Sequence, residues 1–287
     1  MNISLDISKI IRPDAVAVIA DLNATMRQAN VDFMIIGASA RDMVFEDAFA
    51  IRTTRATMDT DFAVHLATWE QHTAISEALL ASKRFTKDVK QKQRYHHSSE
   101  HQIDVVPFGD LEDRPGMISW PPDGDFEMST IGLKEALSNA LNLRIRTDPE
   151  LTVKVCPPFG MAVLKLVSWN DRKHRPQGAG DAQDLAFVLR NYADVDSIHP
   201  EGVASIADVP PGDLDYERAS AWLVGKHISQ LMSKSTSQRL IKILDDDHLG
   251  GIDALAYAIA RQEARIESEN AAESAKGLLF GFRNGLA

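Results

Sequence analysis

The first half of the chain interleaves helical and extended hydrophobic patterns. Apolar residues recur at helical spacing in residues 15–30 and 69–82, which predicts two amphipathic helices. Short apolar runs at residues 33–36, 59–64 and 103–106 predict strands that alternate with these helices along the chain. We therefore expect a sheet packed against helices in this half.

The second half changes from extended to helical patterning. Residues 114–125 are rich in proline and glycine and predict a loop, and residues 141–146 and 151–155 alternate around a turn and predict a hairpin. Beyond the hairpin the apolar positions keep a helical period. The predicted fold class is α+β, with a mixed-sheet core domain over residues 1–150 and a mainly helical C-terminal domain over 151–287.

Composition adds three expectations. At 287 residues, with 44% hydrophobic and 25% charged residues, the chain can bury a large core. It has no apolar run of the ~20 residues that a membrane span requires, no signal-peptide pattern at its start, and Cys156 as its single cysteine. These features predict a cytoplasmic protein without a membrane partner or an intrachain disulfide. The glycine-containing residues 276–287 are expected to be loosely ordered.

Carboxylates in two of the predicted strands indicate metal chemistry. Asp59 and Asp61 share one face of a strand because strand side chains alternate with a period of two. If the strand of Asp104 pairs beside the first, three carboxylates form a cage of hard oxygen ligands for two Mg²⁺ ions, or for Mn²⁺. Such a cage suits in-line nucleotidyl or phosphoryl transfer. The alternative for Asp59-Thr60-Asp61 alone is a solvated acidic pair at a strand edge.

Two further patterns suit a nucleotide. Strand 33–36 runs into Gly37-Ala38-Ser39 and then a helix-compatible stretch from Ala40, a geometry that offers backbone N–H groups to a phosphate. The Ser39 hydroxyl can donate to a phosphate oxygen, or it can simply cap the helix. Farther on, Lys165 interrupts an apolar helix on the face of Arg172, and either extends to solvent or finds a partner.

The next predicted helix carries Asp181 and Asp184 three residues apart, on one face. A hairpin of the two helices would bring Lys165 near Asp184. Three nearby histidines, His96, His97 and His101, lack a zinc spacing with cysteines and are expected on a hairpin or at the surface.

These segments, taken in order, resemble a known superfamily. Residues 37–42 (GASARD), 55–61 (RATMDTD), 103–105 (IDV) and 164–185 look like the nucleotidyltransferase superfamily with a palm of the DNA polymerase β type. The Arg-x-Thr-x-Asp-x-Asp form is similar to AbiEii-type nucleotidyltransferases, the toxins of type IV toxin–antitoxin systems. One departure is Ala38, at a position where that family usually carries glycine or serine.

The resemblance implies an NTP-dependent, pyrophosphate-releasing nucleotidyltransferase. Asp59, Asp61 and Asp104 would be its metal ligands, and Asp184 would orient Lys165 or assist proton transfer. The nucleotide-binding residues would be Gly37, Ala38, Ser39, Arg41, Arg55, Thr57 and Lys165. The resemblance further implies an RNA acceptor, foremost the 3′ end of a tRNA, and an antitoxin protein as a possible partner.

Charge bears on the acceptor. The net charge is −10, which opposes indiscriminate nucleic-acid binding, but basic residues gather in residues 83–94 and 172–175. These clusters either guide an RNA or are solvated surface. Alternatives to RNA are a small hydroxyl compound or a protein side chain, and the altered turn at Ala38 leaves open a catalytically silent nucleotide-binding protein.

Overall fold

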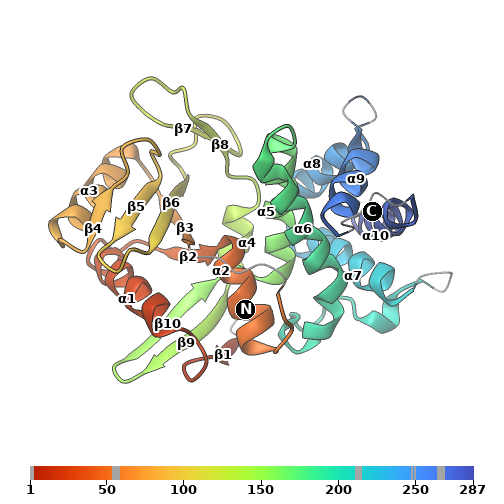
Figure 1. Ribbon diagram of the computed structural model, residues 1–287, viewed down its shortest axis with the longest axis horizontal. Helices are drawn as coiled ribbons and strands as arrows, with labels where there is room; N and C mark the ends of the chain where they lie inside the picture. Colours follow the sequence, from red (N-terminus) through yellow and green to blue (C-terminus); the bar gives the residue numbers. More distant parts are fainter. Residues whose placement is uncertain (1–2, 54–58, 211–214, 247, 249, 264–268) are drawn as a thin grey trace. The chain divides into compact units, whose positions relative to one another are not determined.

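The computed structural model describes residues 3–287 except 54–58, 211–214, 247, 249 and 264–268. Contacts within the chain divide it into two compact units, Met1–Pro157 and Pro158–Ala287 (Figure 1). The first contains a mixed sheet with helices and the second is helical, so the predicted α+β class is confirmed. The division follows the last strand of the sheet, whereas the sequence pattern placed the boundary at residue 150.

The elements of the first unit alternate as the hydrophobic pattern predicts. Its strands are β1 (Ser4–Asp6), β2 (Phe33–Ile36), β3 (Asp59–Leu66), β4 (Phe85–Lys87), β5 (Arg94–His97), β6 (Gln102–Gly109), β7 (Met117–Ser119), β8 (Glu127–Ser129), β9 (Leu141–Thr147) and β10 (Glu150–Val155). Its helical segments are α1 (Pro13–Gln28), α2 (Gly37–Arg41), the π-helical η1 (Asp42–Ala48), α3 (Trp69–Ala81) and α4 (Leu133–Ser138).

The described strands form one mixed sheet of eight and a separate two-stranded ribbon, β7–β8. The order in the large sheet is β1-β9-β10-β2-β3-β6-β5-β4. Strand β3 lies near its centre, antiparallel to β2 and parallel to β6, and β5 runs antiparallel to β6 on the other side. The carboxylate-bearing strands β3 and β6 are therefore direct neighbours, as the metal-cage hypothesis requires.

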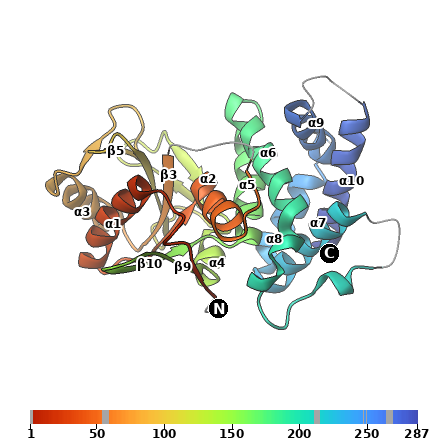
Figure 2. The same ribbon diagram turned by 60° about the horizontal axis from the view of Figure 1, so that its bottom comes forward.

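Helices α1 and α3 cover one face of this sheet and lie side by side (Figure 2). The Tyr95 hydroxyl of β5 donates to Ser76 Oγ of α3 at 2.9 Å, and His97 Nε2 lies 3.0 Å from Asp21 Oδ2 of α1. Because side chains alternate along a strand, Arg94 of β5 points to the opposite face. The candidate carboxylates lie on that same opposite face.

Local signals fix several boundaries as predicted. Strand β2 covers residues 33–36, and Thr68 caps α3 by accepting a hydrogen bond from the Gln71 N–H at 3.3 Å. The predicted hairpin is confirmed as β9 and β10, which pair antiparallel. These elements are specified by short-range chemistry, which explains why the sequence pattern located them closely.

Two local expectations were wrong. The stretch 114–125 contains β7, which pairs antiparallel with β8. The pattern missed this strand because its one buried residue, Ile118, stands among residues typical of turns. Helix α2 begins at Gly37 rather than at Ala40 and continues directly into η1. The expectation that His96, His97 and His101 lie on a hairpin is confirmed, because β5 pairs antiparallel with β6 and His101 lies in the turn between them; His97 and His101 are buried there.

The second unit is an assembly of helices. They are α5 (Pro158–Arg172), α6 (Pro176–Asn191), η2 (Tyr192–Ile198), η3 (Ile206–Asp208), α7 (Tyr216–Leu231), α8 (Lys234–Leu244), α9 (Gly251–Glu263) and α10 (Glu269–Gly285). Helix α5 packs against α6, and α10 packs along α7. The final residues are thus largely helical and packed, not loosely ordered. None of the helices in the described part of the chain is long and apolar enough to cross a membrane.

Candidate active site

Strand register places the acidic residues in two adjacent rows on one face of the sheet. Asp61 of β3 pairs with Asp104 of β6, and Asp104 pairs in turn with Arg94 of β5. Two residues away along each strand, Asp59 of β3 pairs with Gln102 of β6, and Gln102 pairs with His96 of β5. Residues in register on neighbouring strands share a face, so Asp59, Asp61 and Asp104 project together on the face away from α1 and α3.

Gly37 packs directly against the first carboxylate row. It follows Ile36, which pairs with Asp61 across β2 and β3, and its φ of +70° lies in the left-handed region that favours glycine. A Cβ at Gly37 would overlap Asp61 Oδ2. Any other residue at this position would displace the Asp61 carboxylate, so the glycine after β2 and the aspartate on β3 form one structural unit.

The Ser39 hydroxyl is engaged below the site. Ser39 Oγ donates to the backbone oxygen of Asp59 at 2.7 Å and lies 3.3 Å from Thr60 Oγ1. His101 Nε2 completes this chain at 3.0 Å from Thr60 Oγ1. Burial lowers the pKa of His101, which favours the neutral ring. Ser39 therefore anchors the start of β3 to α2. The N-cap of α2 is Ile36, so Ser39 does not cap the helix.

Two other expected nucleotide-binding residues of the first unit belong to α2. Ala38 belongs to the first turn of α2, and Arg41 is 3% exposed with its guanidinium 2.6 Å from Asp42 Oδ1. Desolvation raises the pKa of Asp42 despite this pair. Arg55 and Thr57 lie outside the described residues.

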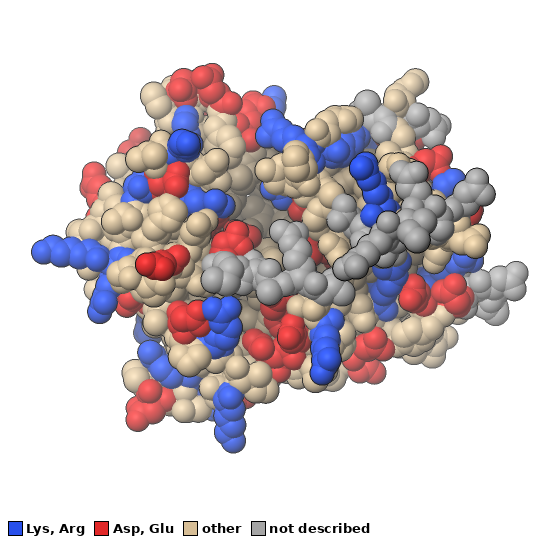
Figure 3. Space-filling view, in the orientation of Figure 1, with Lys and Arg blue, Asp and Glu red and all other residues tan. Residues whose placement is uncertain are grey.

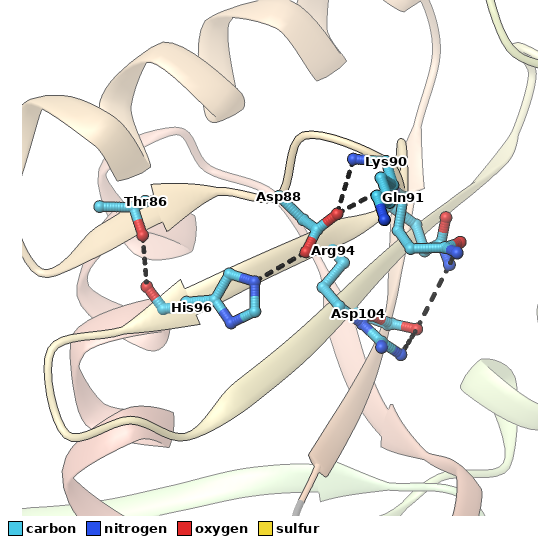
Figure 4. Close-up of polar contacts among 8 residues, drawn as sticks. Thr86, Asp88, Lys90, Gln91, Arg94, His96 and Asp104 are labelled. Atoms are coloured by element: carbon cyan, nitrogen blue, oxygen red, sulfur yellow. Dashed lines mark hydrogen bonds and ion pairs between the residues drawn. The ribbon is translucent and has the colours of Figure 1, made fainter.

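Among the described residues, Arg94 places a cation on the carboxylate face. Its Nε lies 2.8 Å from Asp104 Oδ1 and its Nη2 lies 3.0 Å from Oδ2, which makes a two-point contact. Figure 4 shows the two side chains facing each other. The hydrogen bond from Arg94 to Asp104 raises the pKa of the guanidinium, and the charges of Asp104, Asp59 and Asp61 add to this effect. The sequence pattern grouped Arg94 with a basic surface cluster because the pairing of β5 with β6 is not visible in sequence.

The donor set fits a hard divalent cation, with one condition. Three carboxylates in register offer only oxygen ligands, which suit Mg²⁺ or Mn²⁺. Within the described ranges, no three acidic, histidine or cysteine side chains are already gathered around one point as a metal site. Arg94 engages both oxygens of Asp104, so a cation that uses Asp104 competes with this guanidinium for the carboxylate.

The second unit holds its own buried charge network. Lys165 Nζ of α5 lies 2.6 Å from Asp184 Oδ2 and 3.5 Å from Asp181 Oδ1 of α6. Arg172, on the same face of α5, contacts Asp181 through Nε at 2.8 Å and Nη2 at 2.9 Å. Both aspartates are 3% exposed. Asp184 is thus the nearer partner of Lys165, and Asp181 is shared between the two cations.

Comparison with known proteins gives distant structural similarity. The chain matches no protein-family profile and no curated protein sequence. It is similar to an antigenic nucleotidyltransferase-like protein from Paracoccidioides brasiliensis, with 18% identity and a TM-score of 0.39 over 62% of this chain and 77% of that one.

Two further solved structures are also similar. The antibiotic-resistance factor ANT(2'')-Ia has 14% identity and a TM-score of 0.32, over 80% of this chain and 90% of that one. The Thermotoga maritima CCA-adding enzyme complexed with tRNA has 11% identity and a TM-score of 0.28, over 98% and 82%. At these identities and scores the likeness does not define a family for this chain.

Proposed function

We propose that this chain is a divalent-cation-dependent nucleotidyltransferase that moves a nucleoside monophosphate from an NTP to an acceptor hydroxyl. The observation that carries the proposal is the registered row of Asp61 and Asp104, with Asp59 beside it and Gly37 packed against Asp61. Close backbone approach at a glycine next to paired carboxylates supports the binding of a triphosphate together with its cation.

In the proposed reaction the acceptor oxygen forms a bond to the α-phosphorus, and the bond from that phosphorus to the bridging oxygen breaks. Pyrophosphate leaves with the electron pair of the broken bond. Asp104 accepts the hydroxyl proton, and Gly37 and Ala38 present backbone to the β- and γ-phosphates. Mg²⁺ held by Asp59, Asp61 and Asp104 would supply charge stabilisation at the phosphates and acidify the acceptor hydroxyl.

Lys165 is proposed as the cation for the leaving pyrophosphate, on the strength of the motif resemblance. Its contact with Asp184 supports a positioning role for that aspartate, since a fixed ammonium loses less conformational entropy when it meets a phosphate. Arg41, Arg55 and Thr57 stay in the proposal as nucleotide contacts by resemblance alone.

For the acceptor we propose RNA, most directly the 3′ end of a tRNA, as in the AbiEii-type toxins that the motifs resemble. This proposal includes action in the cytoplasm and control by an antitoxin protein. It is supported by the two basic clusters, of which residues 83–94 contain β4 and the turn that leads into β5.

A small hydroxyl compound is the second candidate, and one observation favours it. Cations of the 83–94 cluster are engaged inside the chain: Lys87 Nζ donates to the Tyr95 hydroxyl at 2.7 Å and Lys92 Nζ lies 2.8 Å from Asp123 Oδ1. With Arg94 on Asp104, little of the cluster is left to hold a phosphate backbone. On the face shown in Figure 3, blue and red side chains intermingle over the sheet-bearing unit.

One labelling experiment separates these possibilities. The protein is incubated with each α-labelled NTP, Mg²⁺ and total cellular extract, and the labelled fraction is identified. Labelled RNA supports the first acceptor, and a labelled small molecule or protein supports the alternatives. Absence of label in every fraction contradicts nucleotidyl transfer and favours a silent nucleotide-binding protein.

A further inference from the structure

The arginine on the carboxylate row belongs to the site by register as well as by contact. Arg94 pairs directly with Asp104, which pairs with Asp61, so three adjacent strands contribute one residue each to a single line. The guanidinium contacts both oxygens of Asp104 and is only partly exposed. A two-point arginine–carboxylate contact of this kind is short and directional.

The turn between β4 and β5 holds this arginine in place without help from Asp104. The Asp88 carboxylate accepts hydrogen bonds from the backbone N–H groups of Lys90 at 2.7 Å and Gln91 at 2.9 Å, and lies 2.8 Å from His96 Nε2 (Figure 4). The Asp88 N–H donates to the Arg94 carbonyl at 3.0 Å. These contacts stabilise the β4–β5 hairpin internally. The backbone position of Arg94 is therefore fixed without its contact to Asp104.

A buried neighbour also turns toward this contact. Gln93 Nε2 lies 3.4 Å from Asp104 Oδ2, while its buried Oε1 has no hydrogen-bond partner. Gln93 therefore adds a second donor beside the guanidinium on the same Asp104 carboxylate.

We propose that Arg94 is a positioning residue that acts as the built-in counter-cation of the carboxylate row. It holds Asp104 while no divalent cation is bound, and it competes with that cation for both carboxylate oxygens. Cation entry moves the guanidinium off Asp104 and leaves it beside the site, free to meet an anionic substrate group. The proposal rests on the proposed function, because it assigns the regulation of the same carboxylates.

Manganese binding in the absence of nucleotide tests this directly. Mn²⁺ affinity of the full chain is measured by titration calorimetry and by electron paramagnetic resonance for wild type, Arg94→Gln, Asp104→Asn and the double variant. Removing one positive charge in contact with the ligands should tighten Mn²⁺ binding about tenfold. Arg94→Lys, which keeps the charge, should stay close to wild type.

The controls keep the result specific. Arg114→Gln removes an arginine paired with Glu127 in an exposed position and should leave Mn²⁺ affinity unchanged. Asp104→Asn should weaken binding, and adding Arg94→Gln to it should bring no further gain because the contested carboxylate is gone. Thermal unfolding of each variant verifies that the sheet is intact.

Unchanged or weaker Mn²⁺ binding by Arg94→Gln overturns the proposal, as does failure of both wild type and Arg94→Gln to bind Mn²⁺. The proposed function fails separately. Tighter binding by Arg94→Gln in a protein that labels no acceptor supports the counter-cation and contradicts nucleotidyl transfer, whereas label transfer with unchanged Mn²⁺ affinity does the reverse.

Discussion

At the scale of single residues, Lys165 shows how a buried charge is accommodated. The apolar helix around it offers no partner, yet α6 supplies two aspartates within 3.5 Å. A lysine in such a place stabilises the helical unit, in addition to any chemistry that it performs. Loss of activity in a Lys165 variant is therefore informative only when stability is measured beside it.

We expect Lys165→Met to lower the free energy of unfolding by about 3 kcal/mol, because it removes one partner from a buried ion-pair network. Lys154→Met is the matched control, since Lys154 pairs with Asp32 where both side chains are exposed, and should cost at most about 1 kcal/mol. Urea denaturation of both variants measures the difference. Equal costs would contradict the view that the α5–α6 network is buried and coupled.

Two half-buried histidines give the protein a pH-dependent stability whose sign can be worked out. Burial lowers the pKa of His72 to about 4 and that of His199 to about 4, from 6.5 in an unfolded chain. Between pH 6.5 and 4 the unfolded chain binds protons that the folded protein refuses, so stability falls as pH falls, by up to about 1.4 kcal/mol per pH unit for each proton. Above pH 6.5 neither histidine changes the stability with pH, because both are neutral in the folded and in the unfolded state.

Asp47 acts in the opposite direction, because burial raises its pKa to about 6 and favours the folded state as pH falls through that value. The histidine effect is isolated by comparing wild type with His199→Phe, which keeps the ring that stacks on Tyr192. Urea denaturation at pH 7 and pH 4.5 should show a smaller stability loss in the variant. An equal loss in both proteins would rule out His199 as a source.

The residue types at the site were predictable, but their partners were not. Asp59, Asp61 and Gly37 could be assigned from local spacing, since alternation and a glycine turn are short-range features. Arg94 could not be placed on Asp104, nor His101 on Thr60, because both contacts depend on strand register. Ser39 was assigned a hydroxyl role toward phosphate, and the structure places that hydroxyl on the Asp59 carbonyl.

At the scale of elements, the close crossing of α7 and α10 explains why the C-terminal residues are ordered. Gly225 of α7 faces α10, where a Cβ would overlap the Phe282 carbonyl oxygen, and Gly281 faces the Arg218 carbonyl oxygen at 2.6 Å from an added Cβ. Glycine weakens an isolated helix, and for this reason the glycines in residues 276–287 predicted a loosely ordered segment. Here the missing side chains let two helix backbones approach, and packing outweighs propensity.

Gly225→Ala should therefore destabilise the protein by about 2 kcal/mol, although alanine is the better helix former by about 1 kcal/mol. Asn284→Ala, on an exposed position of α10, should stay within about 0.5 kcal/mol of wild type. Differential scanning calorimetry of the two variants checks this. A stabilised Gly225→Ala protein would mean that the helices do not approach as closely as described.

At the scale of the whole molecule, the distribution of charge bears on whether the acceptor is an RNA. The chain carries a net charge of −10, and Lys87, Lys92 and Arg94 each have a partner in the fold. An RNA acceptor must then rely on exposed cations of the same cluster. Lys83 and Lys90 are the exposed lysines beside β4 and the β4–β5 turn.

If RNA is the acceptor, Lys83→Glu with Lys90→Glu should weaken RNA binding and flatten its dependence on salt, while NTP binding is unchanged. Lys134→Glu with Lys242→Glu provides a charge-matched control at positions on α4 and α8, outside the cluster. Filter binding between 50 and 200 mM salt, a range chosen for its large expected effect, gives the slope. Equal slopes for both pairs would show that RNA does not dock on the 83–94 cluster.

The central claim is that the registered carboxylates perform nucleotidyl transfer. The direct measurement is label transfer from α-labelled NTP in the presence of Mg²⁺ and cellular extract, for wild type, Asp61→Asn and Asp104→Asn, with thermal unfolding of each protein. We predict transfer by wild type and loss of at least about a thousandfold in both variants. Each variant should still unfold as a folded protein, because asparagine has the size of aspartate and its amide oxygen at position 104 can still accept a hydrogen bond from Arg94. Full transfer by either folded variant would contradict the claim.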